Sequence, residues 1–367
     1  MTVRFAVLGL GSVLTGPYRM RLEQLARRGQ AQVVTVYDPD PVKRRWAADT
    51  FGCREGLDEE EVLSSPDVDA VMVLTSMREH SGLAIRALQH GKHVLVEKPM
   101  AVALEDAQRL IAVARDADRV LVCAPHILLS PTYRELHHRV HTGVIGTPVL
   151  ARARYGWSGP WWGPWFYQRG GGALFDLGVY NLTSLCGFLG SVRRVTAFVG
   201  TAIPERVVDG TPMQVDSEDN AHLLLDFGQS RFASLMTGFT IQKYRSPAIE
   251  LYGTDGVLQL LGDDWAPEGF EQWRNEAGVW ELHPEVDPDW PWTEGVAHLV
   301  DCIEKGHQPV TRPEHAYHAL EVMLGAQESA RSGRVVDIQS EFPALDYSAL
   351  PAVVTDRRAL HDARSTS

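Results

Sequence analysis

The sequence has few cysteines and no long apolar run. Its four cysteines lie far apart and do not follow the spacing of a metal site; they are Cys53, Cys123, Cys186 and Cys302. The first apolar stretch, Phe5–Leu8, is far too short to cross a membrane, and nothing before it resembles a secretory signal. We therefore expect a cytoplasmic protein with buried thiols, no metal centre and no membrane partner.

Positive charge is also scarce. The chain has 35 Lys and Arg against 47 Asp and Glu, which gives a formal net charge of -12. A phosphate-backbone partner would need a basic face, so the charge argues against nucleic acid and favours a small-molecule substrate. The 367 residues contain no low-complexity tract or internal repeat, and they exceed what one hydrophobic core usually serves. We therefore predict two domains.

Short apolar segments alternate with helical patterns over residues 1–124. The predicted strands are residues 5–8, 32–37, 70–74, 93–96 and 120–123, and predicted helices at 19–28, 81–89 and 103–114 lie between them. This alternation is typical of a doubly wound α/β domain with a buried parallel sheet.

The pattern changes after about residue 125. Longer β-type runs then follow one another with little helix between them, at residues 149–155, 192–201, 221–227, 231–239 and 248–251. Successive strands of this kind predict a second, α+β domain with an antiparallel sheet over residues 125–350. Helices are expected at 132–141, 293–304 and 314–332, and residues 351–367 are expected to form a polar tail.

The first predicted strand ends in Gly9-Leu10-Gly11, which is half of the fingerprint of a dinucleotide-binding Rossmann domain. The first glycine permits a tight turn, and the second lets the backbone approach a pyrophosphate at a helix N-terminus. Leu14 takes the third position, where the fingerprint has Gly or Ala. We therefore predict a lengthened phosphate loop, with the helix starting near Pro17.

Asp38 ends the second predicted strand, where an acid binds the hydroxyls of the adenosine ribose. A carboxylate there repels the 2′-phosphate of NADP, so NAD is the expected cofactor and NADP the less favoured one. The nearby cations Lys43, Arg44 and Arg45 could accommodate such a phosphate, although a solvated helix face is their expected role.

A second motif places an aspartate and a tyrosine four residues apart behind three glycines, in the segment Gly170–Tyr180. If this segment enters a helix after the glycines, Asp176 and Tyr180 share one face. A phenol works as a base at neutral pH only where a cation lowers its pKa. Glu97-Lys98-Pro99 supplies a candidate cation in Lys98. Tyr180 is then the expected acceptor of the hydroxyl proton when hydride leaves a carbinol carbon, and Lys98 can stabilise the alkoxide.

Together these two motifs resemble those of the glucose-fructose oxidoreductase/inositol dehydrogenase/MocA family of NAD(P)-dependent sugar dehydrogenases. The resemblance runs from Val3 to about Ile338 and includes the segments Gly91–Pro99 and Ser332–Val336. It implies an NAD(P)-binding Rossmann domain over residues 1–124, then an open, mostly antiparallel sheet, with the active site between them. Because that sheet often serves in oligomer assembly, we expect a homo-oligomer, either a dimer or a tetramer.

The resemblance also implies roles for single residues. The lysine of the Glu-Lys-Pro motif contacts substrate and cofactor in the family, which corresponds to Lys98, and the aspartate of the glycine motif corresponds to Asp176. Most relatives have His where this chain has Tyr180, so it is similar to the branch with glucose-fructose oxidoreductase and dihydrodiol dehydrogenase. A cis Lys98–Pro99 bond is expected. The predicted cofactor-binding residues are Gly9, Gly11, Ser12, Val13, Leu14, Asp38, Thr75, Ser76, His80, Glu97 and Lys98.

Aromatic residues crowd the Gly/Pro-rich segment before the triple glycine: Trp157, Trp161, Trp162, Trp165, Phe166 and Tyr167. Flat aromatic faces suit a pyranose or an aromatic ring, and core or interface packing is the alternative. His126 and Arg169 are further candidates, with a hydrogen-bonded loop position and a surface position as their respective alternatives. The predicted substrate-binding residues are therefore Lys98, His126, Trp162, Trp165, Arg169, Asp176 and Tyr180.

The leading hypothesis is an NAD(P)-dependent dehydrogenase that acts on a CH-OH group of a sugar-like or cyclic polyol substrate. Three alternatives remain open. The protein could keep NAD bound and cleave glycosides through transient oxidation, it could be a trans-dihydrodiol dehydrogenase, or it could be a non-catalytic ligand sensor of the same fold.

Overall fold

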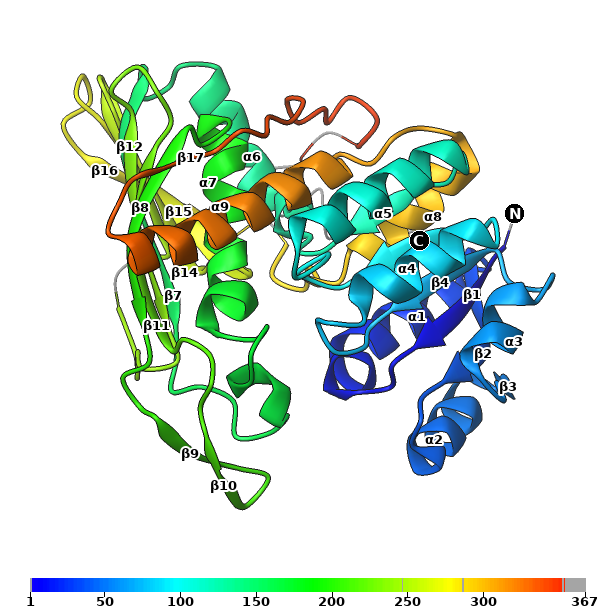
Figure 1. Cartoon of the computed structure of the whole chain (residues 1–367). Helices are drawn as coiled ribbons and strands as arrows, with labels where there is room; N and C mark the ends of the chain where they lie inside the picture. Colours follow the sequence, from blue (N-terminus) through cyan, green and yellow to red (C-terminus); the bar gives the residue numbers. More distant parts are fainter. Residues whose placement is uncertain (1, 246, 286, 352, 354–367) are drawn as a thin grey trace. The chain divides into compact units, whose positions relative to one another are not determined.

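The computed structural model describes residues 2–245, 247–285, 287–351 and 353. The chain forms two compact units (Figure 1). The first consists of Met1–His126 and Pro291–Glu321, and the second of Ile127–Trp290 and Val322–Ser367. Of the polar tail predicted at 351–367, only Pro351 and Val353 are described, and the other positions lie outside the described residues.

The first unit contains a six-stranded sheet in the order β3-β2-β1-β4-β5-β6, in which all neighbouring strands are parallel. This is the Rossmann order, so the predicted fold of this part is confirmed. The strands are β1 (Val3–Leu8), β2 (Ala31–Tyr37), β3 (Arg54–Glu55), β4 (Ala70–Val73), β5 (His93–Val96) and β6 (Leu121–Cys123). The helices are η1 (Leu14–Tyr18), α1 (Arg19–Arg27), α2 (Pro41–Phe51), α3 (Glu59–Ser64), α4 (His80–Gln89), α5 (Leu104–Asp116) and α8 (Gly295–Lys305).

The core of this unit explains why its strands read as unbroken apolar runs. Every residue of β4 is buried, because helices cover both faces of a parallel sheet of this kind. Helix α8, which comes from a distant part of the sequence, adds Val296 and Leu299 to the same core cluster as Phe5 and Val7. The unit is therefore built from two separate stretches of chain.

The helix after the glycine loop begins earlier than the sequence indicated. Helical backbone starts at Ser12, and Leu14–Tyr18 forms a π-helical turn that contains Pro17. In a regular α-helix the proline ring would clash with the carbonyl four residues earlier, and the wider π-helical turn leaves room for the ring. The predicted lengthened loop with a helix start near Pro17 is therefore wrong, and the loop is only Gly9–Gly11.

The second unit contains a nine-stranded sheet in the order β16-β15-β14-β13-β7-β12-β11-β8-β17. Its strand pairs are antiparallel except for β7 and β12, which are parallel, so the predicted open, mostly antiparallel sheet is confirmed. A separate hairpin pairs β9 with β10. The strands are β7 (Pro148–Gly156), β8 (Arg194–Gly200), β9 (Glu205–Val208), β10 (Thr211–Gln214), β11 (Asn220–Asp226), β12 (Phe232–Gly238), β13 (Ile249–Gly253), β14 (Gly256–Asp263), β15 (Ala266–Arg274), β16 (Trp280–Pro284) and β17 (Val336–Asp337).

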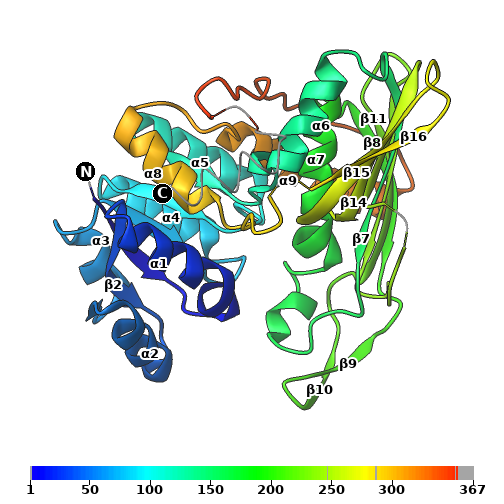
Figure 2. The same ribbon diagram turned by 180° about the vertical axis from the view of Figure 1, so that it is seen from behind.

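Helices of the second unit lie on one face of this sheet, as Figures 1 and 2 both show. They are η2 (Ile127–Leu129), α6 (Pro131–His141), η3 (Pro164–Tyr167), η4 (Leu174–Gly178), α7 (Val179–Leu189) and the C-terminal part of α9 (Pro313–Ser332). Side chains alternate accordingly along β11, where Leu223 and Leu225 are buried and Leu224 is 57% exposed. The opposite face of the sheet therefore presents apolar side chains to the surface.

Candidate active site

The glycine loop at the end of β1 has the geometry that a dinucleotide needs. Gly9 has a φ of +88°, and a Cβ there would lie 2.7 Å from the carbonyl carbon of Leu74. Only glycine fits such a position. A Cβ on Gly11 would meet nothing within 4 Å, which leaves open space over the loop for a phosphate. Ser12 is exposed and Val13 half-buried beside this space, whereas the side chain of Leu14 is buried in the core.

Asp38 fixes the loop from the end of β2. Its Oδ2 accepts a hydrogen bond from the backbone N–H of Leu10 at 2.9 Å, and its Oδ1 accepts one from Asp40 at 3.0 Å. The carboxylate is thereby held beside the glycine loop with acceptor capacity left on both oxygens. Arg44 donates to the backbone carbonyls of Asp38 and Pro39. Arg44, one of the three predicted cations, is therefore engaged by the protein backbone.

The segment after β4 contains a buried hydroxyl that a ligand could satisfy. Thr75 Oγ1 is buried and has no hydrogen-bond partner among the described residues. Ser76 is half-buried next to it. A buried hydroxyl without a partner is costly, so together with the space over Gly11 it fits a nucleotide cofactor at this edge of the sheet.

His80 links this segment to the Glu-Lys-Pro motif. Its Nδ1 lies 2.8 Å from the carbonyl oxygen of Pro99, and its Nε2 lies 3.0 Å from that of Thr75. Burial lowers the pKa of His80, and a neutral ring donates from only one of its nitrogens. The buried ring therefore donates to one of these two carbonyl oxygens and packs against the other, between the backbone segments that follow β4 and β5.

Glu97 orients the backbone that presents Lys98. The hydroxyl of Tyr18 donates to Glu97 Oε1 at 2.7 Å, and the backbone N–H of Lys98 donates to Glu97 Oε2 at 3.0 Å. The Lys98–Pro99 peptide bond is cis, as the resemblance led us to expect. Tyr18, which the sequence did not single out, thus belongs to the support of this motif.

His126 is buried in the same polar group. Its Nε2 lies 3.4 Å from the Tyr18 hydroxyl, and its ring is so close to Gly295 that a Cβ there would lie 2.2 Å from it. Burial lowers the pKa of His126 to about 3, so the ring is neutral at physiological pH. In the structure His126 supports the Tyr18 hydroxyl. This is the hydrogen-bonded loop position expected from the sequence as the alternative to substrate binding.

The triple glycine lets the chain turn sharply into the helix that carries Asp176 and Tyr180. A Cβ on Gly171 would lie 2.6 Å from the carbonyl oxygen of Phe166, and Gly172 has a φ of +107°. Helical backbone follows at once, with Asp176 in the π-helical turn η4 and Tyr180 in the first turn of α7. Both side chains are only 8% exposed. The carboxylate and the phenol thus come from consecutive turns of one helix.

Tyr155, at the end of β7, borders this pair. Its ring meets the Tyr180 ring edge to face, with the centroids 5.8 Å apart. Burial, followed by the nearness of Tyr180 and Asp176, raises the pKa of Tyr155 well above its ordinary value. Tyr155 therefore stays a neutral phenol beside the two predicted catalytic side chains. Its place at the end of a predicted strand was a signal that could have identified it.

Two buried carboxyl groups hold the helix. Leu174 N donates to Oε1 of Glu218 at 3.1 Å, at the start of the helix. Farther along, Asp264 accepts hydrogen bonds from Asn181 Nδ2 at 2.8 Å and from Ser184 Oγ at 2.7 Å. Burial raises the pKa of Glu218 to about 7 and that of Asp264 to about 6. No motif in the sequence marked either residue.

The aromatic segment before the glycines is partly core and partly surface. Tyr167 is buried and donates to the carbonyl oxygen of Pro160 at 2.7 Å, whereas Trp161 is 70% exposed. Trp162 and Trp165 are half-buried; the Trp165 ring stacks on Phe166 at 3.7 Å. Arg169 is exposed. The two half-buried tryptophans are thus the ones that combine a fixed position with an accessible face.

Among the described residues, no group of three or more His, Cys, Asp or Glu side chains could hold a metal ion. Within the same part of the chain, no helix has the length and apolarity that a membrane span requires.

Comparison with known proteins places both units in one family. The family model described as an oxidoreductase family with an NAD-binding Rossmann fold matches residues 3–124, and the GFO/IDH/MocA C-terminal domain matches residues 133–259. The chain is 28% identical to a 1,5-anhydro-D-fructose reductase of Ensifer adhaerens over 291 residues, which cover 77% of this chain and 83% of the relative.

A second relative and a solved structure extend this comparison. The chain is 30% identical over 274 residues to a dTDP-3,4-didehydro-2,6-dideoxy-alpha-D-glucose 3-reductase of Saccharopolyspora spinosa, covering 70% of this chain and 74% of that enzyme. Its fold matches a levoglucosan dehydrogenase, solved with NADH and levoglucosan, at a TM-score of 0.80 and 19% identity, over 92% of this chain and 100% of the other. The chain therefore belongs to the GFO/IDH/MocA oxidoreductase family and is an NAD(P)-dependent oxidoreductase.

Proposed function

We propose that this protein is an NAD-dependent dehydrogenase that acts on a hydroxyl group of a sugar-like or cyclic polyol substrate, with Tyr180 as the acid/base. The observation that carries the proposal is the pair of buried side chains, Asp176 and Tyr180, on consecutive turns of one anchored helix. The names of the two relatives compared above, an anhydrosugar reductase and a nucleotide-sugar reductase, support the sugar-like substrate class.

The first unit offers the cofactor residues. Gly9, Gly11 and the N-terminus of the following helix would hold the pyrophosphate, and the carboxylate of Asp38 would accept the ribose hydroxyls. The negative charge of Asp38 favours NAD over NADP. Arg44 donates to two backbone carbonyls, which reduces its availability for a 2′-phosphate. Bound NAD supplies the hydride acceptor.

The chemistry at the hydroxyl falls to this chain's own side chains. Tyr180 takes the hydroxyl proton as the carbinol carbon is oxidised, and Lys98 lowers the pKa of the phenol and stabilises the developing alkoxide. Asp176 accepts a hydrogen bond from the substrate. The mechanism requires the ammonium group of Lys98 to act on the same oxygen as Tyr180.

Half-buried aromatic faces are proposed to contact the ring of the substrate. Trp162 lies 5.2 Å from Trp161 and 5.7 Å from Trp157, measured between ring centroids, and is thus held in a cluster of indoles. Trp165 is held by its stacking on Phe166. Rigid aromatic faces of this kind bury the apolar side of a sugar ring at little cost in side-chain entropy.

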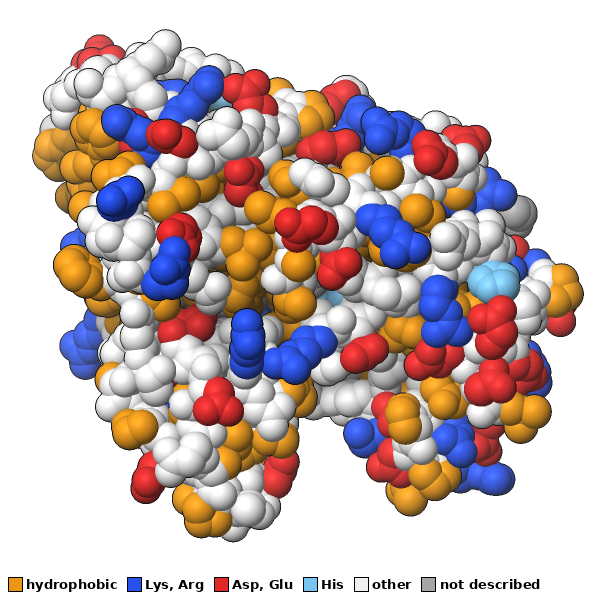
Figure 3. All heavy atoms as spheres, in the orientation of Figure 1, with side chains coloured by type: hydrophobic (Ala, Val, Ile, Leu, Met, Phe, Trp, Pro, Cys, Tyr) orange, Lys and Arg blue, Asp and Glu red, His pale blue; other side chains and the backbone are white. Residues whose placement is uncertain are grey.

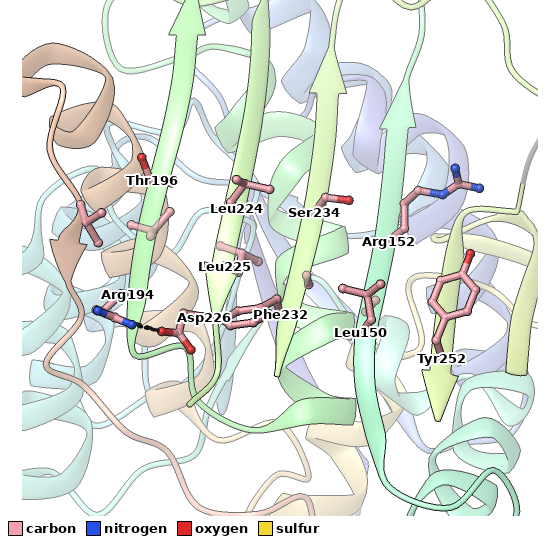
Figure 4. A pocket seen from close by; sticks show the side chains of 14 residues that line it. Leu150, Arg152, Arg194, Thr196, Leu224, Leu225, Asp226, Phe232, Ser234 and Tyr252 are labelled. Carbon is pink, nitrogen blue, oxygen red and sulfur yellow. Dashed lines mark hydrogen bonds and ion pairs between the residues drawn. The ribbon is translucent and has the colours of Figure 1, made fainter. Parts of the chain in front are cut away.

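We further propose that the protein forms a homo-oligomer through the open face of the nine-stranded sheet. Figure 4 shows Leu150, Leu224 and Phe232 on neighbouring strands of this face, beside the ion pair of Arg194 with Asp226. Phe198 is 88% exposed on the adjoining strand β8. Hydrophobic side chains gather over this sheet at the left of Figure 3. Contiguous apolar surface of this kind is typical of a subunit interface.

The function is tested by incubating the protein with NAD, and in parallel with NADP, and a panel of sugars, inositols, glycosides and dihydrodiols. We expect the absorbance of the reduced nicotinamide to increase when a sugar or polyol is the substrate. The variant Tyr180→Phe should lose turnover by about 10²- to 10⁴-fold, since it removes the acid/base, while its affinity for NAD stays the same. Full activity in this variant would remove Tyr180 from the mechanism.

Other outcomes of the same assay identify the alternatives. Cleavage of a glycoside without net NADH would indicate an enzyme that retains its cofactor. Reduction of NAD by a dihydrodiol alone would indicate a dihydrodiol dehydrogenase. Binding of NAD without turnover of any compound in the panel would indicate a ligand sensor.

A further inference from the structure

One short segment of the second unit, residues 216–219, contacts both the helix of Asp176 and Tyr180 and the aromatic segment. It precedes β11, and none of the sequence motifs includes it. Glu218 and Ser217 are buried. The segment thus connects two parts of the chain to which we assign different tasks, acid/base chemistry and contact with the substrate ring.

On the helix side, Glu218 makes two contacts with the first turn. Its Oε1 accepts from the N–H of Leu174 at 3.1 Å, and its backbone oxygen accepts from the N–H of Ala173 at 3.2 Å. These are among the N–H groups that a helix leaves unpaired at its start. A Cβ on Gly172 would lie 2.2 Å from Oε1 of Glu218, so the last glycine of the motif makes room for this carboxyl group.

On the aromatic side, the residues before Glu218 hold the end of the Trp-rich segment. Asp216 N donates to the carbonyl oxygen of Tyr167 at 2.8 Å. Ser217 Oγ donates to the carbonyl oxygen of Phe166 at 3.1 Å. A shift of the Glu218 backbone would therefore move both the start of the helix and the segment that carries Trp165.

The surroundings of the carboxyl group make its charge costly. It faces the backbone N–H of Leu174, the side chain of Gln327 on α9, and the neighbouring Asp219. Asp219 is itself held by the backbone N–H groups of Ala202 and Ile203 and by Arg206. Within the described part of the chain, no cation is among the groups that act on Glu218, and burial raises its pKa to about 7. The group therefore changes charge within the ordinary working range of an enzyme.

We propose that Glu218 is a positioning residue for the reaction: its carboxyl group fixes the first turn of the helix that carries Asp176 and Tyr180 and joins this turn to the aromatic segment. Both charge states accept from Leu174 N, but burial makes the anion costly, so ionisation lowers the free energy needed to open this turn to water. The proposal rests on the proposed function, because that function gives Asp176 and Tyr180 their roles.

The activity test compares Glu218→Gln and Glu218→Ala with the control Glu250→Gln. Glu250 is another buried carboxyl group of the same unit, but it lies on β13, away from the helix. Glu218→Ala should lower kcat roughly ten- to a hundredfold, because small misplacements of reacting groups have effects of that size, with KM for NAD unchanged. Glu218→Gln keeps the shape and an acceptor, and should restore kcat to within about threefold of wild type at low pH.

The pH dependence separates positioning from simple structural support. The ratio of wild-type kcat to Glu218→Gln kcat cancels the titration of Tyr180, which both proteins share. We expect this ratio to be constant below about pH 6 and to fall by roughly threefold or more above about pH 8, with a midpoint near the pKa of Glu218. A ratio that does not change with pH, or full activity in Glu218→Ala, would overturn the proposal.

Amide hydrogen exchange provides a readout that needs no substrate. In wild type, the protection of the amides at 174–178 relative to those of β11 should decrease between the ordinary glutamate pKa of 4.5 and the raised value of about 7, and should level off above it. In Glu218→Gln the relative protection should be the same at every pH. Equal behaviour of the two proteins would overturn the proposal. A wild type without activity on any sugar, but with the expected exchange difference, would reject only the proposed function.

Discussion

The rings of Tyr155 and Tyr180 meet edge to face, with their planes at 88° to each other. This arrangement places the positive edge of one ring against the negative face of the other, a contact worth about 0.5–1.5 kcal/mol beyond the buried area. Because Tyr155 comes from β7 and Tyr180 from α7, the contact fixes the phenol of the predicted acid/base against the sheet.

The first prediction concerns this contact. Tyr155→Phe keeps the ring and should leave kcat within about threefold of wild type, whereas Tyr155→Leu should lower it by roughly three- to tenfold, the kinetic equivalent of the lost ring contact. Steady-state kinetics with the substrate found in the panel measures both. Equal kcat values for wild type and Tyr155→Leu would show that the contact does not position Tyr180.

The second prediction concerns the dependence of Tyr180 on a cation. Lys98→Met and Tyr180→Phe should each lower kcat by about 10²- to 10⁴-fold, because each removes one part of a single proton-transfer unit. The double variant should be about as slow as the slower single variant. Single-turnover rates measure this. Losses that multiply would show that the two residues act independently.

The Rossmann unit was predictable because local signals define it. Unbroken apolar strands, a glycine at a sharp turn and an acid at the end of β2 each depend on residues close together in the sequence. The predicted strand at 93–96 agrees with β5 (His93–Val96). The turn at Leu14–Tyr18 was missed because a proline after Thr15-Gly16 has the same local signature at a helix start as inside a π-helical turn.

The support of the candidate site was not predictable in the same way. Tyr18 and Glu97 are 79 residues apart, and Glu218 and Leu174 are 44 apart. Each of these pairs exists only through tertiary packing, and an isolated Glu before a strand carries no sign that it will be buried at a helix start. The predicted strand at 248–251 corresponds to β13, and the sheet continues beyond it with β14, β15 and β16. The pairing of these three strands also depends on the finished sheet.

The third prediction concerns the choice of cofactor. Asp38→Asn should raise the ratio of kcat/KM with NADP to that with NAD by about tenfold or more, since it removes the charge that repels a 2′-phosphate. Asparagine still offers one acceptor to the loop. The neighbouring Asp40→Asn is the control, because Asp40 instead caps α2 through Val42 N. An unchanged ratio in Asp38→Asn would remove Asp38 from cofactor discrimination.

The fourth prediction concerns pH and stability. Burial raises the pKa of Asp264 from 3.8 to about 6, so the folded state holds a proton that the unfolded state has lost. The stabilising contribution is complete below about pH 4 and decreases as pH rises to about 6. The difference in unfolding free energy between wild type and Asp264→Asn should therefore decline over this window and stay level above it.

Urea unfolding at a series of pH values measures this difference. Glu250→Gln is the control, because Glu250 accepts from Arg152 and Gln259, whereas Asp264 accepts from Asn181 and Ser184. A difference that rises with pH between 4 and 6 would contradict the assigned direction of the shift.

The fifth prediction concerns the sheet face. Leu224→Lys places a charge in the middle of the exposed apolar surface and should convert the oligomer to a monomer, as measured by light scattering coupled to gel filtration. Leu57→Lys is the matched control, since Leu57 is an exposed leucine of the first unit. A wild-type protein that is already monomeric would reject the proposed oligomer.

Helix α8 also affects the order in which the chain can fold during synthesis. The core that begins with Val3 includes Val296, Leu299 and Val300, so it is complete only after those residues have left the ribosome. Domains usually fold in the order in which they are made. Here β7–β16 emerge before the first unit has its last helix, so the sheet of the second unit can pair while the N-terminal unit is still unfinished.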